Sequence, residues 1–424
     1  MKILLSAYSC APCKTSEPGN AWRSVNHALA EGHEVWALIE KSEYEPGMMS
    51  YLAENPMPRF HPVFFQLPHW MVRALRRPGM LGCVYYHLWQ HKMLGIAQKL
   101  HDEIGFDLVH HVTFGRYWSP CGIRDLGIPF IWGPVGAAEY APSAFLAELP
   151  IRERWFEFVR DFIRAVSQRD PALRATARAA TIGIGVSREA CEAIRDLGVR
   201  RVEQLPQAAL AADELETFGK FPSPPPGPFR AICMGRLLHW KGFHLAIRAF
   251  GLFAKNDPEA ELWLINNGPF RPNLEEIAAR TGVADRIRFF GHLPSYADVL
   301  AKLAQAHVLM HPALHEAFGN VCMEAMAAGR PVVCLDIGGP ASQVTAETGF
   351  VAPIHDPQEA IEAMAGFLTR VSRDRALLAK LSEQARARVH EKFTMRTMGA
   401  AISRFYEEAV AAHPAPTRRA AFAY

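Results

Sequence analysis

The fold of this chain is decided by the stretch His311-Pro-Ala-Leu-His-Glu-Ala-Phe-Gly-Asn-Val-Cys-Met-Glu-Ala-Met-Ala-Ala-Gly-Arg-Pro-Val-Val333. An apolar strand, residues 306–310, precedes a loop, and the loop leads into a helix. We expect this helix to start near Gly319, because glycine and asparagine tolerate the tight backbone of such a junction. Glu316 then lies in the loop and Glu324 lies one to two turns into the helix. Both carboxylates can face one cleft at the carboxyl end of a strand, where open α/β sheets bind their ligands.

The beginning of the predicted helix offers a second kind of group to the same cleft. Its first N–H groups have no partner inside the helix, and the helix dipole favours an anion there, which makes a ready site for a phosphate. Carboxylates accept hydrogen bonds from hydroxyl groups. Two carboxylates around a phosphate site therefore suit a sugar nucleotide.

The composition is typical of a globular protein with more than one domain. At 424 residues the chain is too long for one ordinary core, so two domains are expected. Hydrophobic residues make up 50% and charged residues 21%, as in soluble proteins. The net charge of +3 is small and does not imply a nucleic-acid partner.

The cysteines and the chain start predict a cytoplasmic protein. The 8 cysteines are scattered, mostly in apolar settings, as expected of reduced thiols. Cys10 and Cys13 form the one close pair, without a second pair at zinc-like spacing, so we expect no metal site. The apolar run that begins at Met1 is too short for a signal peptide and is better interpreted as a buried strand. No stretch approaches the roughly 20 apolar residues of a membrane span.

Strand-like and helix-like segments alternate in both halves of the chain, which predicts parallel sheets. In the first half, strands are expected at 2–7, 34–39, 107–112, 129–132 and 179–186, and helices at 21–31 and 187–197, the second one capped by Ser187. In the second half, strands are expected at 230–234, 261–266, 287–290, 306–310 and 331–335, and helices at 243–253, 273–280 and 296–304.

A segment rich in proline and glycine, residues 218–229, separates the two halves and is interpreted as part of a stiff linker. The expected organisation is a first α/β domain over residues 1–210, a linker over 211–228, a second α/β domain over 229–392, and a tail over 393–424. The tail contains a helical pattern that can pack back on the first domain, but the sequence alone does not decide this.

A second candidate group of site residues follows the first strand of the second domain. In the segment Gly235-Arg-Leu-Leu-His-Trp-Lys-Gly242, glycine permits a sharp turn, and Arg236 and Lys241 project from the loop. Two fixed cations at a strand end suit a diphosphate, and charge-assisted hydrogen bonds of this kind contribute about 1.5–3 kcal/mol each. Alone, these residues are equally well explained as surface cations. Together with Glu316 and Glu324 they favour a phosphate site.

These motifs resemble the retaining GT-B glycosyltransferases of family four. The resemblance covers most of residues 230–350, and it is weaker in the first half. It rests on Gly235-Arg236, Lys241-Gly242, the turn Ile265-Asn-Asn-Gly268-Pro269, Phe290-Gly291, His311-Pro312, the two glutamates with Phe318-Gly319 between them, Gly329-Arg-Pro-Val-Val333 and Gly338-Gly339-Pro340. In the first half, it rests on Ser16-Glu17-Pro18-Gly19, Gly32-His33-Glu34-Val35, Asp107-Leu-Val-His-His111 and Ile128-Pro-Phe-Ile-Trp-Gly-Pro134. The resemblance implies a GT-B fold, in which two Rossmann-like parallel-sheet domains face each other across a cleft.

The resemblance also implies a role for each residue of the donor site. Arg236 and Lys241 would neutralise the departing diphosphate, Glu316 would contact the hydroxyls of the transferred sugar, and Glu324 would contact the ribose. Backbone N–H groups would face sugar and phosphate, and the Gly19 loop would lie against the diphosphate from the other domain. The donor-binding residues are thus expected to be Gly19, Gly268, Phe318, Gly319, Asn320 and Glu324. Transfer would proceed with retention by front-face attack, without a metal or other cofactor, and the chain contains no Asp-x-Asp motif.

Two positions depart from the family pattern. Many relatives carry a histidine just after the strand that matches residues 130–132, where this chain has Gly133-Pro134-Val135-Gly136. His110 or His111 could fill that role from the preceding strand, or both could be structural. Relatives also have a Pro-Asn-Gly-Val-Asp-like turn before the linker, which Leu205-Pro206-Gln207-Ala208 replaces here.

The expected acceptor is a saccharide linked to a lipid. Residues 55–101 contain no Asp or Glu but interleave basic and aromatic residues, which suits an anionic bilayer. The helix predicted over 151–168 carries Trp155, Phe156, Val159, Phe162, Ile163 and Val166 along one side. Arg152, Arg154, Arg160 and Arg164 lie largely elsewhere on it. The alternative for both segments is that the aromatic residues are core and the basic residues an ordinary solvated face.

Taken together, the sequence predicts a retaining hexosyltransferase that uses a UDP-sugar or GDP-mannose in exopolysaccharide or surface-glycan assembly. The protein is expected in the cytoplasm, where it can contact the inner face of the plasma membrane. Two alternatives remain: transfer to a soluble small molecule, and binding of a nucleotide sugar without turnover. The sequence names neither the nucleotide nor the sugar.

Overall fold

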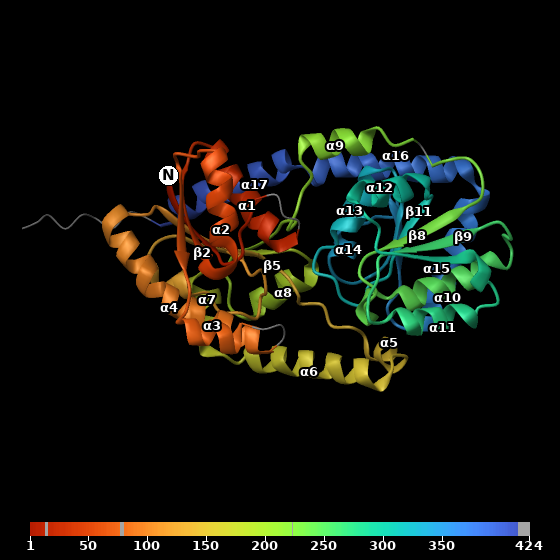
Figure 1. Ribbon diagram of the computed structural model, residues 1–424, viewed down its shortest axis with the longest axis horizontal. Helices are drawn as coiled ribbons and strands as arrows, with labels where there is room; N and C mark the ends of the chain where they lie inside the picture. Colours follow the sequence, from red (N-terminus) through yellow and green to blue (C-terminus); the bar gives the residue numbers. More distant parts are fainter. Residues whose placement is uncertain (13–15, 77–79, 223, 414–424) are drawn as a thin grey trace, which may run out of the picture.

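A computed structural model describes residues 1–12, 16–76, 80–222 and 224–413. It contains two α/β domains side by side, each built on one parallel sheet (Figure 1). The first sheet has 7 strands in the order β3-β2-β1-β4-β5-β6-β7, and the second has 6 in the order β10-β9-β8-β11-β12-β13. The GT-B architecture predicted from the sequence is thus confirmed.

The strands of the first sheet are β1 (Lys2–Ala7), β2 (Glu34–Glu40), β3 (Phe60–Phe65), β4 (Leu108–Thr113), β5 (Phe130–Val135), β6 (Ile182–Gly185) and β7 (Val202–Gln204). Those of the second are β8 (Arg230–Met234), β9 (Glu261–Ile265), β10 (Ile287–Gly291), β11 (Val308–His311), β12 (Val332–Leu335) and β13 (Gly349–Ala352). Most central strands are continuous apolar runs, because helices cover both faces of a parallel sheet.

The helices of the first half are α1 (Ser16–Ala30), α2 (Lys41–Glu54), α3 (His69–Leu75), α4 (Met80–Ile104), α5 (Ser143–Ala147), α6 (Ile151–Ser167), α7 (Pro171–Ala179), α8 (Arg188–Asp196) and α9 (Ala212–Gly219). Those of the second half are α10 (Phe243–Ala254), α11 (Arg271–Ala279), α12 (Tyr296–Gln305), α13 (Asn320–Ala327), α14 (Gly338–Gln343), α15 (Pro357–Arg373), α16 (Arg375–Lys392) and α17 (Met395–Ala411). Short 3-10 turns lie at Gly122–Leu126 (η1), His239–Lys241 (η2) and Ala284–Arg286 (η3).

Two segments cross between the domains. Helix α17 follows the second domain in sequence but packs on the first sheet, where Phe405 and Tyr406 are buried in the core around β1 and β4. In the other direction, α5 leaves the first domain and inserts Phe145 into the core of the second, against Phe243 and its neighbours. Helix α6 then runs along the bottom of Figure 1, back toward the first domain. Each domain therefore completes part of the other's packing.

Two local expectations need correction. The linker predicted over 211–228 begins with a helix, α9, because Glu214 accepts a hydrogen bond from the N–H of Ala211 and closes the first turn. Gly19 does not lie in a loop but in the first turn of α1, where a preceding proline is tolerated because the first helical N–H groups have no partner.

Candidate active site

A cavity of about 360 Å³ lies between the two domains. The first domain contributes Glu17 and Asn20 of α1, Gly115 and Arg116 after β4, Ala137 after β5, and Gln207. The second contributes Met234, Gly235, Lys241, His311 and the run from Glu316 to Val321. The carboxyl ends of β8 and β11 both open into this cavity, as expected for a ligand site of a parallel sheet.

Lys241 and Glu316 form the charged centre of the cavity. Lys241 ends η2 and its ammonium group pairs with Oε2 of Glu316. The same oxygen lies 3.3 Å from Nε2 of His311, the last residue of β11. Burial alone would raise the pKa of Glu316, but the hydrogen bond from His311 and the charge of Lys241 outweigh it and lower the pKa to about 2. Glu316 is therefore an anion at neutral pH, held beside a fixed cation.

The N-terminus of α13 supplies donors to the same cavity. Gly319 caps the helix with φ 82°, a left-handed conformation that favours glycine. Within the described parts of the chain, the backbone N–H groups of Phe318, Gly319, Asn320 and Val321 have no hydrogen-bond acceptor. Several unpaired donors at a helix start form an anion site, and Lys241 lies beside them.

The two loops that carry these groups are fixed to each other. The N–H of Leu314 donates to the carbonyl of Trp240 over 2.7 Å. A Cβ at Gly242 would lie 1.7 Å from the carbonyl oxygen of Pro312, so only glycine allows this approach. Gly268, which the sequence assigned to donor binding, packs against the backbone of Leu237 and supports the first loop from outside the cavity.

Glu324 lies one turn further along α13 and does not line the cavity. Its surroundings are Tyr296 of α12 and the pair formed by Arg23 of α1 and Glu214 of α9, which are 3.8 Å apart. Burial raises the pKa of Glu324 to about 7, against the hydrogen bond from Tyr296 and the charge of Arg23. The carboxylate thus lies near the contact between the domains, beside rather than within the cavity.

The structure does not bring the remaining predicted donor residues to the cavity. Arg236 is exposed and makes no hydrogen bond or ion pair among the described residues. Gly19 is buried inside α1, and its neighbours Glu17 and Asn20 face the cavity instead. Cys13 lies outside the described residues, and Cys10 is buried.

Of the two possibilities left open for His110 and His111, the structure favours the structural one, because both rings are buried with hydrogen-bond partners. His110 is buried between the hydroxyl of Tyr406 at 2.8 Å and the carbonyl of Gly133 at 2.6 Å. His111 is buried between the hydroxyl of Ser6 at 3.0 Å and the carbonyl of Phe114 at 3.1 Å. Burial lowers the pKa of each to about 4, so both are neutral structural residues.

The first domain lines the cavity with four polar side chains that were not predicted as site residues: Glu17, Asn20, Arg116 and Gln207. One oxygen of Glu17 accepts the N–H of Gly115 over 2.7 Å, and burial raises the pKa of this carboxyl despite that bond and the nearby Arg116. Glu17 belongs to the motif Ser16-Glu17-Pro18-Gly19, and Gln207 belongs to the segment Leu205-Pro206-Gln207-Ala208 that departs from the family pattern. Their positions in these two segments were the only sequence signal for a place in the site. Nothing in the sequence pointed to Arg116.

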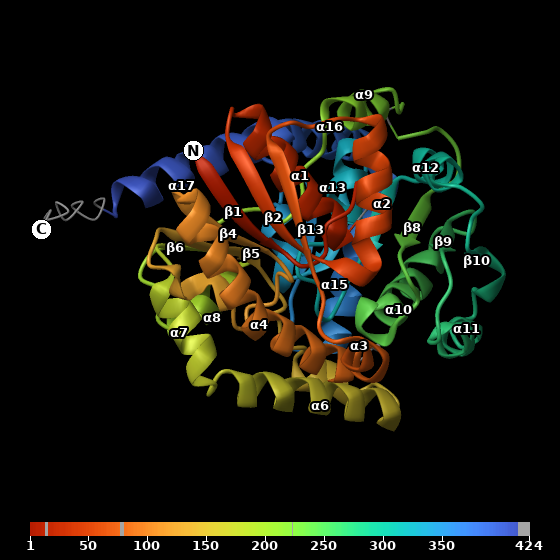
Figure 2. The ribbon, with the colours of Figure 1, turned by 60° about the vertical axis from the view of Figure 1, so that its left-hand side comes forward.

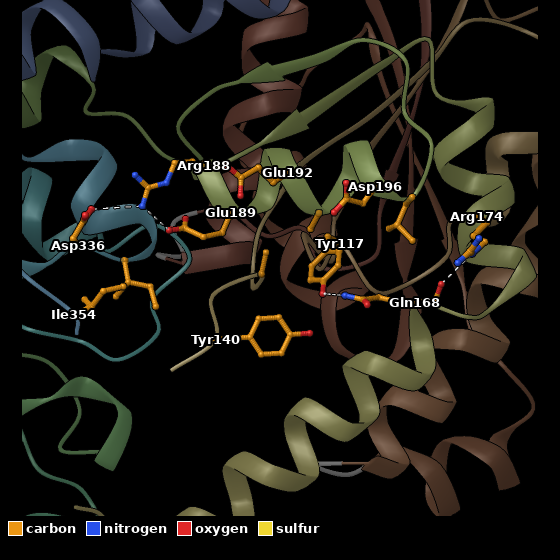
Figure 3. Close-up of a pocket in the computed structure, with 14 residues that line it drawn as sticks. Tyr117, Tyr140, Gln168, Arg174, Arg188, Glu189, Glu192, Asp196, Asp336 and Ile354 are labelled. Carbon is orange, nitrogen blue, oxygen red and sulfur yellow. Dashed lines mark hydrogen bonds and ion pairs between the residues drawn. The ribbon is translucent and has the colours of Figure 1, made fainter. Parts of the chain in front are cut away.

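Two further cavities adjoin the domain contact. One, of about 450 Å³, belongs to the first domain and shares Arg116 with the cavity described above. It is lined by Tyr8, Glu43, Tyr44, Arg76, Gly82, Cys83, Tyr85, Tyr86, Phe114 and Arg116. The other, of about 540 Å³, lies between α8 and the second domain (Figure 3). There Arg188 reaches across to Asp336 at 3.5 Å, and none of the predicted donor residues is present.

The outer surface beside these cavities carries exposed apolar side chains. Those on α6 are Ile151, Trp155, Phe156, Phe158, Phe162 and Val166, and those on α3 and α4 are Trp70, Leu81 and Val84. The polar residues Glu157 and Arg164 of α6 are instead buried. The alternative interpretation of residues 55–101 was that their aromatic residues belong to the core. It largely holds, because Phe60, Tyr85, Tyr86 and Trp89 are buried. In the described parts of the chain, no helix is both long and apolar enough to span a membrane.

Comparison with known proteins agrees with this geometry. Residues 216–388 match the family "Glycosyl transferases group 1". The chain is 26% identical to a 2-deoxystreptamine glucosyltransferase of Streptomyces kanamyceticus over 62% of this chain and 68% of that protein. It is 32% identical to the lipopolysaccharide core biosynthesis glycosyltransferase LpsE of Rhizobium meliloti over 43% of this chain and 50% of that protein.

The two-domain fold is also found in solved structures. Anabaena HepE, solved in complex with UDP, superposes with a TM-score of 0.62 at 16% identity, over 96% of this chain and 100% of that one. The matches to curated relatives cover about half to two thirds of their length, whereas the likeness in fold covers both domains. The resemblance found in the sequence is therefore confirmed in the GT-B fold of the chain and in residues 216–388, which match the group 1 glycosyl transferases.

Proposed function

We propose that this protein transfers a hexose from a nucleotide sugar to a saccharide acceptor, with retention of configuration. The single observation that carries the proposal is the cavity in which Lys241, Glu316 and the free N–H groups at the start of α13 meet. Cations and N–H donors suit a diphosphate, and a fixed carboxylate suits the hydroxyls of a sugar. HepE, whose fold is alike, was solved in complex with UDP, which supports a nucleoside diphosphate as the ligand class.

The reaction needs stabilisation of the diphosphate as its bond to the sugar breaks. Lys241 and the N–H groups of Phe318 to Asn320 would face the negative charge that develops on the leaving oxygen, in a cavity that already fixes them. Glu316 would orient the sugar through its hydroxyls. Arg236 is exposed on the loop after β8 that also carries Lys241, and it would reach the diphosphate once the donor is bound. The proposal requires neither a metal nor another cofactor.

The acceptor would bind in the first-domain cavity that shares Arg116 with the donor cavity. Tyr8, Tyr44 and Phe114 offer aromatic faces and hydroxyl groups, which suit a sugar ring. Arg76 and Arg116 suit an acceptor that also carries phosphate. An acceptor hydroxyl seated there would meet the donor sugar near Arg116.

We further propose that the acceptor is linked to a lipid and reached at the cytoplasmic face of a membrane. Figures 1 and 2 both place α3 beside α6, and these helices expose Trp70 and the apolar side of α6. Arg73, Arg152 and Arg154 are exposed on the same two helices and suit anionic lipid. The lipopolysaccharide-assembly role in the name of LpsE favours this setting.

A second candidate is transfer to a soluble small molecule. It is favoured by the name of the 2-deoxystreptamine glucosyltransferase, whose match extends over 62% of this chain. A third, nucleotide-sugar binding without turnover, is favoured by the absence of a histidine from the described lining of the cavity on the first-domain side.

The experiment that tests the donor assignment is thermal unfolding against a panel of UDP-sugars and GDP-mannose. A bound donor stabilises the native state in proportion to the logarithm of its concentration over its dissociation constant, so the true donor shifts melting most. Slow release of free sugar from that donor, without acceptor, distinguishes an enzyme from a binding module. A panel that shifts melting nowhere would overturn the proposal.

A further inference from the structure

Helix α6 contributes one buried carboxylate to the loops of the donor cavity, although it lies outside that cavity. Glu157 has only 1% of its side chain exposed. Its Oε1 accepts hydrogen bonds from Nε2 of His239 at 2.7 Å and from Nε2 of His315 at 3.2 Å. Burying a carboxylate costs free energy unless its hydrogen bonds are kept, and the hydrogen bonds of Glu157 come from two separate loops.

Both histidines stand next to the proposed donor-site residues. His239 opens η2, which ends at Lys241, and His315 immediately precedes Glu316. Through one carboxylate, α6 therefore contacts the loop after β8 and the loop after β11 at the same time. Arg160, one turn along α6, lies 3.4 Å from the other oxygen of Glu157 and balances its charge.

Aromatic stacking reinforces the same contact. The ring of Trp240 stacks on that of Phe156 of α6, with the ring centroids 5.6 Å apart and the planes at 8°. It also stacks on the ring of His315, with the centroids 5.4 Å apart and the planes at 16°. Trp240 is the residue between His239 and Lys241, and its carbonyl accepts a hydrogen bond from the N–H of Leu314. Phe156 and Glu157 thus contact the loop after β8 and the loop after β11 at the points where these two loops contact each other.

The electrostatics agree with a permanent contact. Burial would raise the pKa of Glu157, but the hydrogen bonds from His239 and His315 and the charge of Arg160 lower it far below its usual range. Burial lowers the pKa of His315, despite the hydrogen bond and charge of the neighbouring Glu157. An ionised Glu157 that accepts two N–H donors is the stable state of the cluster.

We infer that Glu157 is a positioning residue: from the first-domain helix α6 it holds His239 and His315, and thereby sets the distance between Lys241 and Glu316. The inference rests on the proposed function, because it assigns that pair to the donor. It predicts that the α6 contact contributes to turnover although Glu157 touches no substrate. Misplacement of groups by about 1 Å costs up to about 100-fold in rate.

The test compares Glu157→Gln, which keeps the shape of the side chain and removes its charge, with Glu153→Gln on the same helix. Glu153 makes no hydrogen bond or ion pair among the described side chains and serves as the matched control. With whichever of UDP-glucose, UDP-galactose and GDP-mannose the wild-type chain uses, Glu157→Gln should lower kcat about 10- to 100-fold. The KM for the donor and the Kd for the free nucleoside diphosphate should stay within about twofold. Equal losses in kcat and nucleotide affinity, or no loss, would overturn the inference.

Hydrogen exchange of the unliganded protein gives a second readout that does not depend on the donor. Glu157→Gln should speed amide exchange in residues 235–242 and 312–319, whereas Glu153→Gln should leave both segments as in the wild-type chain. Unchanged exchange in both segments would overturn the inference. A wild-type chain that turns over no nucleotide sugar would overturn the proposed function instead, and exchange would still decide whether Glu157 anchors the loops.

Discussion

At the scale of single residues, the predicted site residues that line the cavity between the domains all belong to the second domain. Lys241 and Glu316 follow the first and fourth strands of the second domain, and neighbouring parallel strands end at one edge of a sheet. This rule is enough to predict that the two residues lie close together. Arg236 precedes a tight turn, and no rule states on which side of the turn its flexible side chain lies.

The structural role of His110 and His111 has a physical reason. Successive residues of a strand point to opposite faces, so the sequence could not decide whether either ring faces a site. In a central parallel strand, however, helices cover both faces. Both rings are therefore core, and each is satisfied by one side-chain hydroxyl and one carbonyl.

Glu324 gives a prediction at this scale. The resemblance implies that Glu324 contacts the ribose, which requires the ribose to extend from the cavity to the neighbouring start of α13. On that proposal, Glu324→Ala should raise the KM for the donor about 10- to 100-fold and leave kcat nearly unchanged, because a hydrogen bond from a ribose hydroxyl to a carboxylate contributes about 1.5–3 kcal/mol in ground and transition states alike. Steady-state kinetics with the donor identified by thermal unfolding checks this. Unchanged donor affinity would remove Glu324 from the ribose site.

At the scale of elements, α6 is the helix whose orientation the sequence did not decide. Its apolar side was visible in the sequence, and burial of that side was the ordinary expectation. The structure has the opposite arrangement: Trp155 is 66% exposed, while Arg164 is buried and donates to the carbonyl of Glu139 over 2.7 Å. The polar residues face inward because they have specific partners there.

Other elements were missed for local reasons. The edge strand β3 contains Pro62 and is only half-buried, so its sequence lacks the continuous apolar run of the central strands. Strand β7 has 3 residues, too few for a period to be visible. Helix α9 lies directly before a proline-rich stretch, and such a composition favours an irregular, stiff linker.

The exposed side of α6 gives the prediction at this scale. Changing Phe158 and Phe162 to Ser should reduce flotation with anionic vesicles of phosphatidylglycerol, because both rings lie on the surface proposed to enter the bilayer. Met49→Ser on α2 is the control, since Met49 is 51% exposed but lies on another helix. Equal flotation of all three proteins, or none by the wild-type chain, would argue against a bilayer contact through α6.

At the scale of the whole molecule, the sequence predicted two domains and left the contacts between them open. Contacts between residues far apart in sequence depend on the packing of complete domains, which a short motif does not encode. The pair of His110 and Tyr406, 296 residues apart, is one such contact, and Arg188 with Asp336 is another. Each ties a segment to a domain that it does not belong to in sequence.

The buried histidines predict acid sensitivity of the folded chain. The pKa of His110, His111 and His307 is lowered by burial to about 4, and that of His244 to about 3, from an unfolded value near 6.5. The unfolded chain therefore binds more protons between these values. Each histidine contributes stability that is complete above about pH 6.5 and is lost as pH falls toward its folded pKa.

Urea unfolding at several pH values between about 6.5 and 4 checks this. The free energy of unfolding should fall across the window, and His110→Gln should give a shallower slope because one proton fewer is taken up. An identical slope in both proteins would mean that His110 is not the buried neutral group described here.

The central claim is that Lys241 stabilises the leaving diphosphate of a nucleotide sugar in the cavity between the domains. The most direct measurement is the comparison of donor Kd and kcat for Lys241→Ala with those for Lys255→Ala, whose lysine is exposed and distant in sequence from the site. We predict that Lys241→Ala lowers kcat about 100-fold or more while donor Kd changes by about threefold at most, because the charge on the leaving group grows in the transition state. Equal losses in affinity and turnover, or turnover like that of Lys255→Ala, would contradict the account.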